Sequence, residues 1–151
     1  MAIPRAFFLT WVTYGSWLPG DSRGWADRKT HQYHEGQPDL ERWAGGQMKH
    51  KVVGLNQAQR DLVEKAIEDD CCYRGYELRI VKCQSNHVHV VVRCGDVLPK
   101  KVMKTFKTYA TRALRAEGYF LDQKIWAQDG SKRRIFDEND VIKAYEYVRN
   151  Q

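Results

Sequence analysis

Two short apolar segments joined by two polar residues constrain the fold of this chain more than any other feature. Residues 78–84 (LRIVKCQ) and 87–93 (HVHVVVR) are rich in β-branched side chains and have the length of strands. Only Ser85 and Asn86 lie between them, and a connection of two residues favours a tight antiparallel hairpin. The chain therefore contains at least part of an antiparallel sheet.

The register of this hairpin decides which side chains share a face. A two-residue turn pairs Cys83 with Val88 and Lys82 with His89. Side chains two apart in a strand project from one face, so His87 and His89 stand side by side while the alternate valines point into the core. Two neutral imidazoles are natural ligands for a divalent metal, although such a pair also occurs as ordinary strand structure. Because cross-strand partners share a face, Cys83 lies on the valine side, which argues against a closed zinc site.

The rest of the chain predicts an α+β fold in which an antiparallel sheet has helices packed on one face. The expected elements are a strand at 6–13, a helix at 56–74 between Asn56 and Gly75, a helix at 99–117 that begins at Pro99, short strands at 125–126 and 133–136 around the turn Asp129-Gly130, and a last helix at 138–151 capped by Asp137.

A single domain of residues 1–151 is expected, with a long irregular insertion at about 14–54. The length of 151 residues suits one domain. The insertion is rich in Gly, Pro, Asp, Arg and Trp and has no stable periodicity, and loops of this length are often functional. Its tryptophans Trp17, Trp25 and Trp43 would either stack on unpaired bases or anchor the loop.

The charge of the chain favours a polyanionic partner. The formal net charge is +6, and the helix predicted at 99–117 carries much of it. Its basic side chains are expected to contact phosphates without reading the DNA sequence: Lys100, Lys101, Lys104, Lys107, Arg112 and Arg115.

The sequence carries no sign of a membrane or secreted protein. No apolar run approaches the roughly 20 residues of a membrane helix, no signal peptide is recognisable, and the four cysteines lack disulfide spacing. A cytoplasmic, nucleoid-associated protein is expected.

A second candidate constellation lies at the end of the chain. In a helix, Tyr147 and Gln151 are one turn apart and project from the same side, so a phenol and an amide could reach the same small volume. A core tyrosine on an amphipathic helix is the alternative interpretation. Tyr145 is about 200° away around the helix and is expected to pack.

Three blocks of the sequence resemble the small single-tyrosine HUH transposases of bacterial insertion sequences, which include the REP-associated tyrosine transposases. The blocks are FFLTWVTYGSWLPGDSRGW at 7–25, SNHVHVVV at 85–92 and IWAQDGSKRRIFDENDVIKAYEYVRNQ at 125–151. They occur in the family's order over nearly the whole chain. The resemblance implies a ferredoxin- or RRM-like antiparallel sheet with the HUH motif on a central strand.

The resemblance also implies roles for individual residues. His87 and His89 resemble the metal-ligating pair, Tyr147 resembles the nucleophile, and Gln151 resembles the polar residue that completes the metal site. Relatives commonly continue beyond the position of Gln151. The implied activity is DNA transposition: nicking and rejoining of single-stranded DNA through a 5′-phosphotyrosine, with Mg²⁺ or Mn²⁺ as cofactor. The expected partners are hairpin-containing element ends and a possible second copy in a homodimer.

Other functions remain compatible with the residues themselves. One is a non-catalytic module that binds single-stranded nucleic acid. A second is a metal-dependent phosphodiester hydrolase that activates water and leaves no covalent intermediate. A third is a non-mobile relative that performs the same chemistry in a host role.

Overall fold

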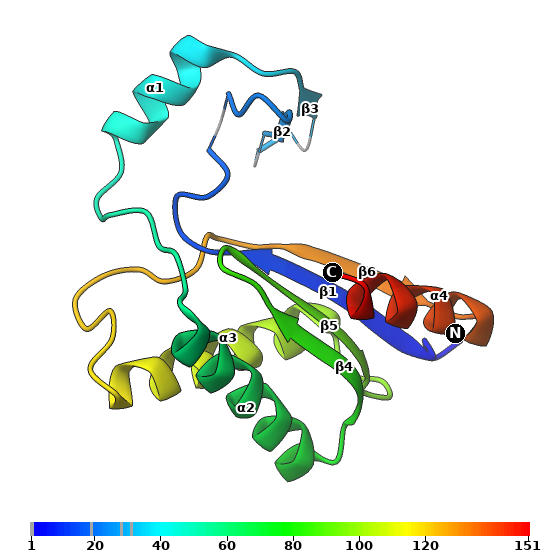
Figure 1. Ribbon diagram of the computed structural model, residues 1–151. Helices are drawn as coiled ribbons and strands as arrows, with labels where there is room; N and C mark the ends of the chain where they lie inside the picture. The colour runs from blue at the N-terminus through cyan, green and yellow to red at the C-terminus, as the bar shows by residue number, and fades with distance from the viewer. Residues whose placement is uncertain (1, 19, 28, 31) are drawn as a thin grey trace.

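The computed structural model describes residues 2–18, 20–27, 29–30 and 32–151, and its main body is a four-stranded sheet with helices on both faces (Figure 1). The elements are β1 (Ala6–Val12), β2 (Trp25–Ala26), β3 (Tyr33–His34), α1 (Pro38–Gly46), α2 (Gln57–Arg74), β4 (Glu77–Cys83), β5 (His87–Arg93), α3 (Pro99–Ala116), β6 (Ser131–Ile135) and α4 (Glu138–Arg149).

The sheet has the strand order β4-β5-β1-β6, and every neighbouring pair is antiparallel. The predicted hairpin register is confirmed, because Cys83 pairs with Val88 and Lys82 with His89. The strand that carries His87 and His89 is an inner one, flanked by β4 and β1. Both imidazoles are therefore held on a strand that is hydrogen-bonded on its two sides.

The helices divide between the two faces, which corrects the expectation that they pack on one face. α2 and α3 cover the face of Val88, Val90 and Val92 and build the larger core. α4 packs on the other face, where Val91 belongs to a second, smaller core. The reason is visible in β5, where all four valines are completely buried. A strand with apolar side chains on both faces needs cover on both.

Local signals set the predicted helix ends. Asn56 forms a capping box with Gln59 at the start of α2, and Gly75 ends that helix with φ of 74°. The Asp137 side chain accepts a hydrogen bond from the Asn139 amide at the start of α4. α4 ends at Arg149, so Gln151 lies just beyond the helix.

The segment predicted to be wholly irregular forms a small lobe that stands away from the sheet (Figure 1). It contains the ladder of β2 with β3 and the helix α1, so the prediction was wrong for these elements. The two ends of the lobe meet at the sheet, where the Val53 amide donates to the Tyr14 carbonyl and the Thr13 hydroxyl donates to the Val53 carbonyl at 2.7 Å.

Of the short strands predicted near the end, one is present and one is reduced to a bridge. β6 begins at Ser131, two residues before the predicted start, and Trp126 makes only an isolated bridge with Thr13. The predicted turn is present, since Asp129 has φ of 64° and Gly130 φ of 157°. None of the helices in the described ranges combines the length and apolar character that crossing a bilayer requires.

Candidate functional site

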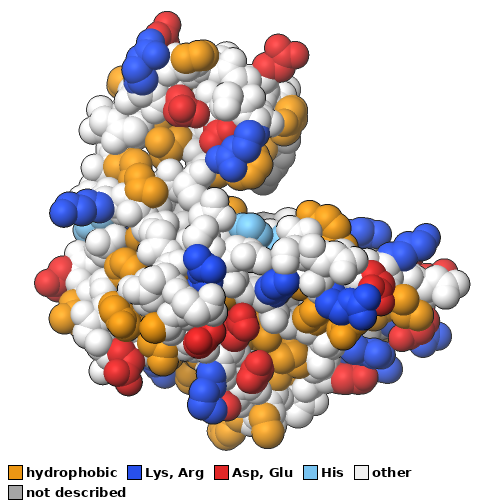
Figure 2. Space-filling view, viewed as in Figure 1, with side chains coloured by type: hydrophobic (Ala, Val, Ile, Leu, Met, Phe, Trp, Pro, Cys, Tyr) orange, Lys and Arg blue, Asp and Glu red, His pale blue; other side chains and the backbone are white. Residues whose placement is uncertain are grey.

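The two imidazoles on β5 lie side by side on the face that α4 partly covers. Their ring centroids are 4.7 Å apart. His89 is buried, with 7% of its surface exposed, whereas His87 at the strand's start is partly exposed. Figure 2 shows histidine side chains at the foot of a hollow between the lobe and the body. Because His87 is partly exposed, the pair is reachable from solvent at the start of the strand.

Each imidazole is oriented by a hydrogen bond at Nδ1. His87 Nδ1 is 2.7 Å from the Asn86 side-chain oxygen, and His89 Nδ1 is 2.8 Å from the Thr10 hydroxyl. An amide oxygen only accepts, so Nδ1 of His87 carries the proton. The Thr10 hydroxyl can accept from or donate to Nδ1 of His89, so the tautomer of His89 depends on which of the two groups donates. Nε2 of His87 therefore keeps a free lone pair, and Nε2 of His89 does so in the tautomer whose Nδ1–H donates to Thr10, which is the arrangement that metal-ligating histidines show.

Burial keeps both imidazoles neutral. Desolvation lowers the pKa of His87, and desolvation together with the neighbouring His87 lowers the pKa of His89 to about 4. A protonated imidazole cannot bind a metal, because both nitrogens are then donors. At neutral pH the pair is in the form that a cation requires.

Tyr147 lies directly beside this pair in the same chain. Its ring centroid is 5.8 Å from that of His89 and 6.0 Å from that of Phe8, and Phe8 in turn contacts His89 at 5.7 Å. Tyr147 is nevertheless 53% exposed. The structure thus brings the predicted nucleophile against the two predicted imidazole ligands, while about half of the Tyr147 surface stays exposed to solvent.

The side chains of Lys82 and Gln151 both donate hydrogen bonds to backbone oxygens at the end of α4. Lys82, the cross-strand partner of His89, donates to the backbone oxygens of Arg149 and Gln151 at the helix end. An ammonium group there satisfies carbonyls that have no partner within the helix. The Gln151 amide nitrogen donates to the Tyr147 carbonyl at 3.2 Å, which leaves its side-chain oxygen free. The helix was predicted to continue to Gln151 but ends at Arg149, so Gln151 lies beyond the helix and is tied to Tyr147 by this hydrogen bond.

Two other tyrosines on helices, Tyr109 and Tyr145, have different surroundings. Tyr109 lies on α3, which packs on the opposite face of the sheet, and its ring lies near the guanidinium groups of Arg74 and Arg112. Tyr145 is half-buried on α4. Of the three, only Tyr147 contacts an imidazole in the part of the chain that is described.

The predicted phosphate-binding cations are not gathered at the imidazole pair, because α3 lies on the other face of the sheet. Three of them have intramolecular roles. Lys107 donates to the carbonyls of Ala127 and Asp129, and burial lowers its pKa to about 8. Arg115 donates to two carbonyls of the following loop, and Arg112 lies 5.2 Å from the Tyr109 ring centroid. The side chains exposed along the first turns of α3 are Lys100, Lys101 and Lys104.

The tryptophans of the lobe differ in how much of each ring is free. Trp17 is covered by the Arg23 guanidinium at 3.8 Å, and Trp25 is stacked on His34 with centroids 4.6 Å apart. Trp43 is 63% exposed. Trp17 and Trp25 therefore anchor the lobe, at least in part, and Trp43 presents a ring to solvent.

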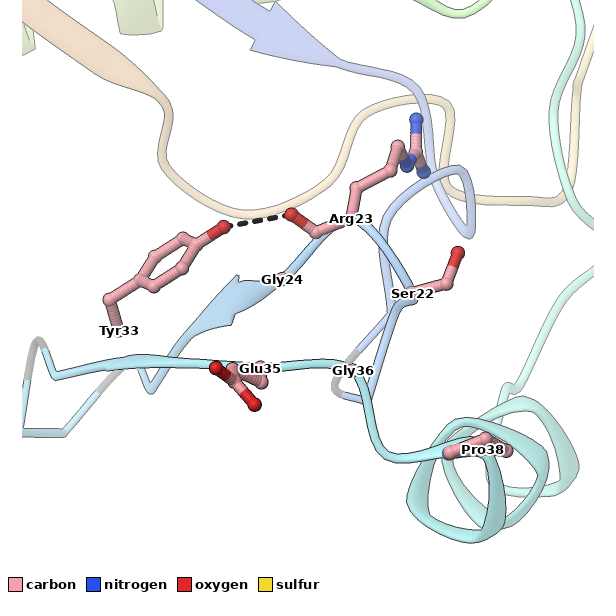
Figure 3. Close-up of a pocket in the computed structure, with 7 residues that line it drawn as sticks. All are labelled: Ser22, Arg23, Gly24, Tyr33, Glu35, Gly36 and Pro38. Carbon is pink, nitrogen blue, oxygen red and sulfur yellow. Dashed lines mark hydrogen bonds between the residues drawn. The ribbon is translucent and has the colours of Figure 1, made fainter.

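The lobe also encloses a pocket of about 440 Å³. Figure 3 shows its lining, in which the Tyr33 hydroxyl donates to the Arg23 carbonyl at 2.8 Å. The lining residues are Ser22, Arg23, Gly24, Tyr33, Glu35, Gly36 and Pro38. A larger groove, of about 570 Å³, lies between α2 and α3. Neither cavity is lined by His87, His89 or Tyr147.

Two residues of the site were not singled out from the sequence, although the pattern holds a signal for each. Thr10 is a polar residue in an otherwise apolar strand, and it faces His89 across β1 and β5. Lys82 shares the face of His89 by the hairpin register alone. What the sequence lacked was the pairing of β1 with β5 and the position of the α4 end.

Within the described residues, no group of three or more His, Cys, Asp and Glu side chains is placed to hold a metal. The two imidazoles could supply two ligands to a cation, with further positions left to an amide oxygen, water or a phosphate oxygen. An open coordination sphere of this kind suits a catalytic ion better than a structural one.

Comparison with known proteins agrees with this architecture. The family model described as IS200-like transposase matches residues 47–151, which include the imidazole strand and α4 but not β1 or most of the lobe. The crystal structure of a proposed transposase from Deinococcus radiodurans R1 superposes with a TM-score of 0.54 at 13% identity, covering 100% of this chain and 93% of that chain. At that identity the likeness concerns the fold. No curated protein matches.

Proposed function

Because the chain belongs to the IS200-like transposase family, we propose that it nicks and rejoins single-stranded DNA, with Tyr147 as the nucleophile and His87 and His89 as ligands of a divalent metal. The observation that carries the proposal is the contact of the Tyr147 ring with the imidazole pair of its own chain. Tyr147 is far from His87 and His89 in the sequence, so the fold of the chain is what brings the three side chains together.

The residues of the chain supply specific parts of this reaction. The Tyr147 oxygen attacks the scissile phosphorus in line and loses its proton, the bond from phosphorus to the 3′-oxygen breaks, and that oxygen leaves as a 3′-hydroxyl after protonation. The 5′-phosphate stays on Tyr147 as a phosphodiester. Attack by another 3′-hydroxyl then reverses these bond changes and releases the tyrosine, so rejoining needs no external energy source.

The side chains present fit a divalent metal at this site, since the two imidazoles are neutral and each can present Nε2 when its Nδ1 carries the proton. A bound Mg²⁺ or Mn²⁺ would polarise the scissile phosphate and stabilise the charge that develops on it. His87 and His89 would hold the ion through Nε2, with Asn86 and Thr10 fixing their orientation. The free oxygen of the Gln151 side chain, one turn beyond Tyr147, is a third candidate ligand.

Covalent capture tests the proposal without knowledge of the recognised sequence. The protein is incubated with Mn²⁺ and a pool of single-stranded hairpins with randomised flanks, and adducts that survive denaturation are isolated and sequenced. We expect an adduct with the parent, none with Tyr147→Phe, and retention with the matched control Tyr145→Phe. Peptide mapping should place the DNA on Tyr147.

The same assay separates the alternatives. DNA that is cut without any adduct would indicate a hydrolase that activates water, and binding without cutting would indicate a non-catalytic module. Mixing His89→Ala with Tyr147→Phe chains tests whether the tyrosine acts within one chain. We expect no adduct from the mixture, because each Tyr147 contacts its own imidazole pair. Restored activity would mean that α4 is exchanged between two copies.

A further inference from the structure

The face that carries the imidazole pair continues across the sheet to its outer strand, β6. In one row, His89 pairs with Thr10 of β1, and Thr10 pairs with Ser131 of β6. In the next row, Arg133 pairs with Phe8, whose ring contacts both His89 and Tyr147. Cross-strand partners share a face, so Ser131 and Arg133 lie on the face of the imidazole pair.

Arg133 differs from the other cations around this site in having no partner. Lys82 is bound to the carbonyls at the end of α4. Arg149 is paired with Glu146 at 2.8 Å, and Arg79 is paired with Glu138 at 3.3 Å. Within the described part of the chain, the Arg133 guanidinium has neither an ion pair nor a hydrogen bond. Among the described cations around the imidazole pair, Arg133 therefore stands out as one with no side-chain partner.

The position of Arg133 also leaves it accessible. β6 is an edge strand, and both Ser131 and Arg133 are exposed, whereas Ile135 two residues further is buried under α4. Arg133 and the imidazole strand are two strand spacings apart, which is about 10 Å. A phosphate bound near Arg133 would therefore be separate from the one attacked by Tyr147, yet close enough to belong to the same strand of DNA.

We propose that Arg133, with Ser131 beside it, forms a phosphate-binding subsite on β6 for the DNA backbone next to the scissile phosphate. This proposal rests on the proposed function. The guanidinium presents paired donors that match two phosphate oxygens, and the serine hydroxyl adds a third donor. The subsite positions the strand, so that the scissile phosphate faces Tyr147 in line. Arg133 is a positioning residue that acts on the DNA backbone rather than on the reacting atoms.

The first test measures binding alone. In a Tyr147→Phe background with EDTA, the probe is a fluorescein-labelled hairpin that carries an oligothymidylate tail. Arg133→Ala should weaken binding about tenfold and lower the slope of log affinity against log salt by about 0.7, as expected when one single-strand phosphate is no longer neutralised. The matched control is Arg134→Ala, which removes the same charge from the same strand on the opposite face. It should keep the parental slope.

A second measurement locates the contact on the DNA. Single phosphates of the tail are replaced one at a time by neutral methylphosphonates. At one position the neutral linkage should weaken binding of the parent but not of Arg133→Ala, because both changes remove the same interaction. Arg133→Lys should recover part of the affinity but less than a bidentate contact provides. A thermal melt of each variant checks that the fold is intact.

The outcomes separate this inference from the proposed function. An equal decrease of the salt slope in Arg133→Ala and Arg134→Ala, or no decrease in either, overturns the subsite, even if the parent forms a covalent adduct. A selective decrease in Arg133→Ala supports the subsite even if the parent forms no adduct, in which case the transferase chemistry is what fails. When the adduct does form, Arg133→Ala should slow it about tenfold in the randomised pool.

Discussion

The sheet body and the lobe of this protein are stabilised in different ways. The body contains two hydrophobic cores, one on each face of a sheet whose inner strands bury side chains on both sides. The lobe has one short helix and a ladder of two residue pairs, and it relies on stacked pairs such as Arg23 on Trp17 and Trp25 on His34. Catalytic side chains must be held in fixed positions, which a well-packed core provides. A surface that adapts its shape to a ligand does not need such a core.

The candidate chemistry follows this division. Every residue proposed to take part in bond changes lies on the body, held by strand pairing or by the packing of α4. The exposed Trp43 and the pocket around Tyr33 lie on the lobe, which has fewer apolar contacts. The body therefore positions the reacting groups, and the lobe offers exposed surface to a ligand.

The largest effect is expected from the imidazole pair. Replacing both His87 and His89 by Ala should abolish Mn²⁺ binding, because it removes both imidazole ligands and the described residues contain no group of three or more His, Cys, Asp and Glu side chains placed to hold a metal. Isothermal titration calorimetry should show one site in the parent and none in the double variant, with the melting transition largely kept. Equal binding of Mn²⁺ by both proteins would contradict the assignment. His34→Ala in the lobe is the matched control and should bind as the parent does.

One substitution in each region tests how much that region contributes to the free energy of unfolding. Phe106 is fully buried in the body and Trp43 is 63% exposed in the lobe. Phe106→Ala should lower the free energy of unfolding by about 3–5 kcal/mol, whereas Trp43→Ala should change it by about 0.5 kcal/mol or less. Urea unfolding followed by circular dichroism measures both. A large decrease for Trp43→Ala would show that the lobe is part of the cooperative core.

The buried imidazole should make the body sensitive to acid. The pKa of His89 is lowered from 6.5 to about 4 in the folded protein, so the unfolded chain takes up a proton first. The contribution of the neutral His89 to the free energy of unfolding is fully present above pH 6.5 and is lost as the pH falls toward 4. The loss is on the order of 3 kcal/mol. Metal-free unfolding in EDTA at a series of pH values measures it. His89→Gln should flatten this pH dependence, and an unchanged profile would contradict a buried neutral imidazole.

The smallest effects are expected at the exposed surfaces. Lys101→Ala combined with Lys104→Ala should lower the salt slope of single-stranded DNA binding by about 0.7 for each phosphate that is no longer neutralised. Trp43→Ala should weaken binding at constant slope, because base stacking is not an ionic contact. Fluorescence anisotropy at several salt concentrations distinguishes the two. If neither variant differs from the parent, α3 and the lobe tryptophan are solvated surfaces that do not contact DNA.

Much of the architecture could be predicted because it depends on neighbours in the sequence. The hairpin register follows from a two-residue turn and strict alternation, and it correctly put His87 and His89 on one face. The ends of α2 follow from the side chain of Asn56 and the left-handed conformation of Gly75. The helix α1 was missed because its sequence ends in two glycines and is too short to show periodicity.

The roles of the cations could not be predicted, since charge in the sequence does not show which partner a side chain meets. Lys107 was expected to contact phosphate, and the fold places it against the carbonyls of Ala127 and Asp129. Arg133 was not singled out, because its significance depends on the pairing of β6 with β1. That pairing joins the two ends of the chain.

The amino-acid sequence alone predicted the hairpin, the helices α2, α3 and α4, the shared face of the two imidazoles and the family resemblance. These depend on turn length, alternation and capping, which are interactions between residues close together in the chain. The three-dimensional fold alone shows that α4 packs on the other face, that Tyr147 contacts His89 within one chain, and that Thr10 and Arg133 share that face. Such contacts depend on the order of strands in the sheet, which hydrophobic periodicity does not encode.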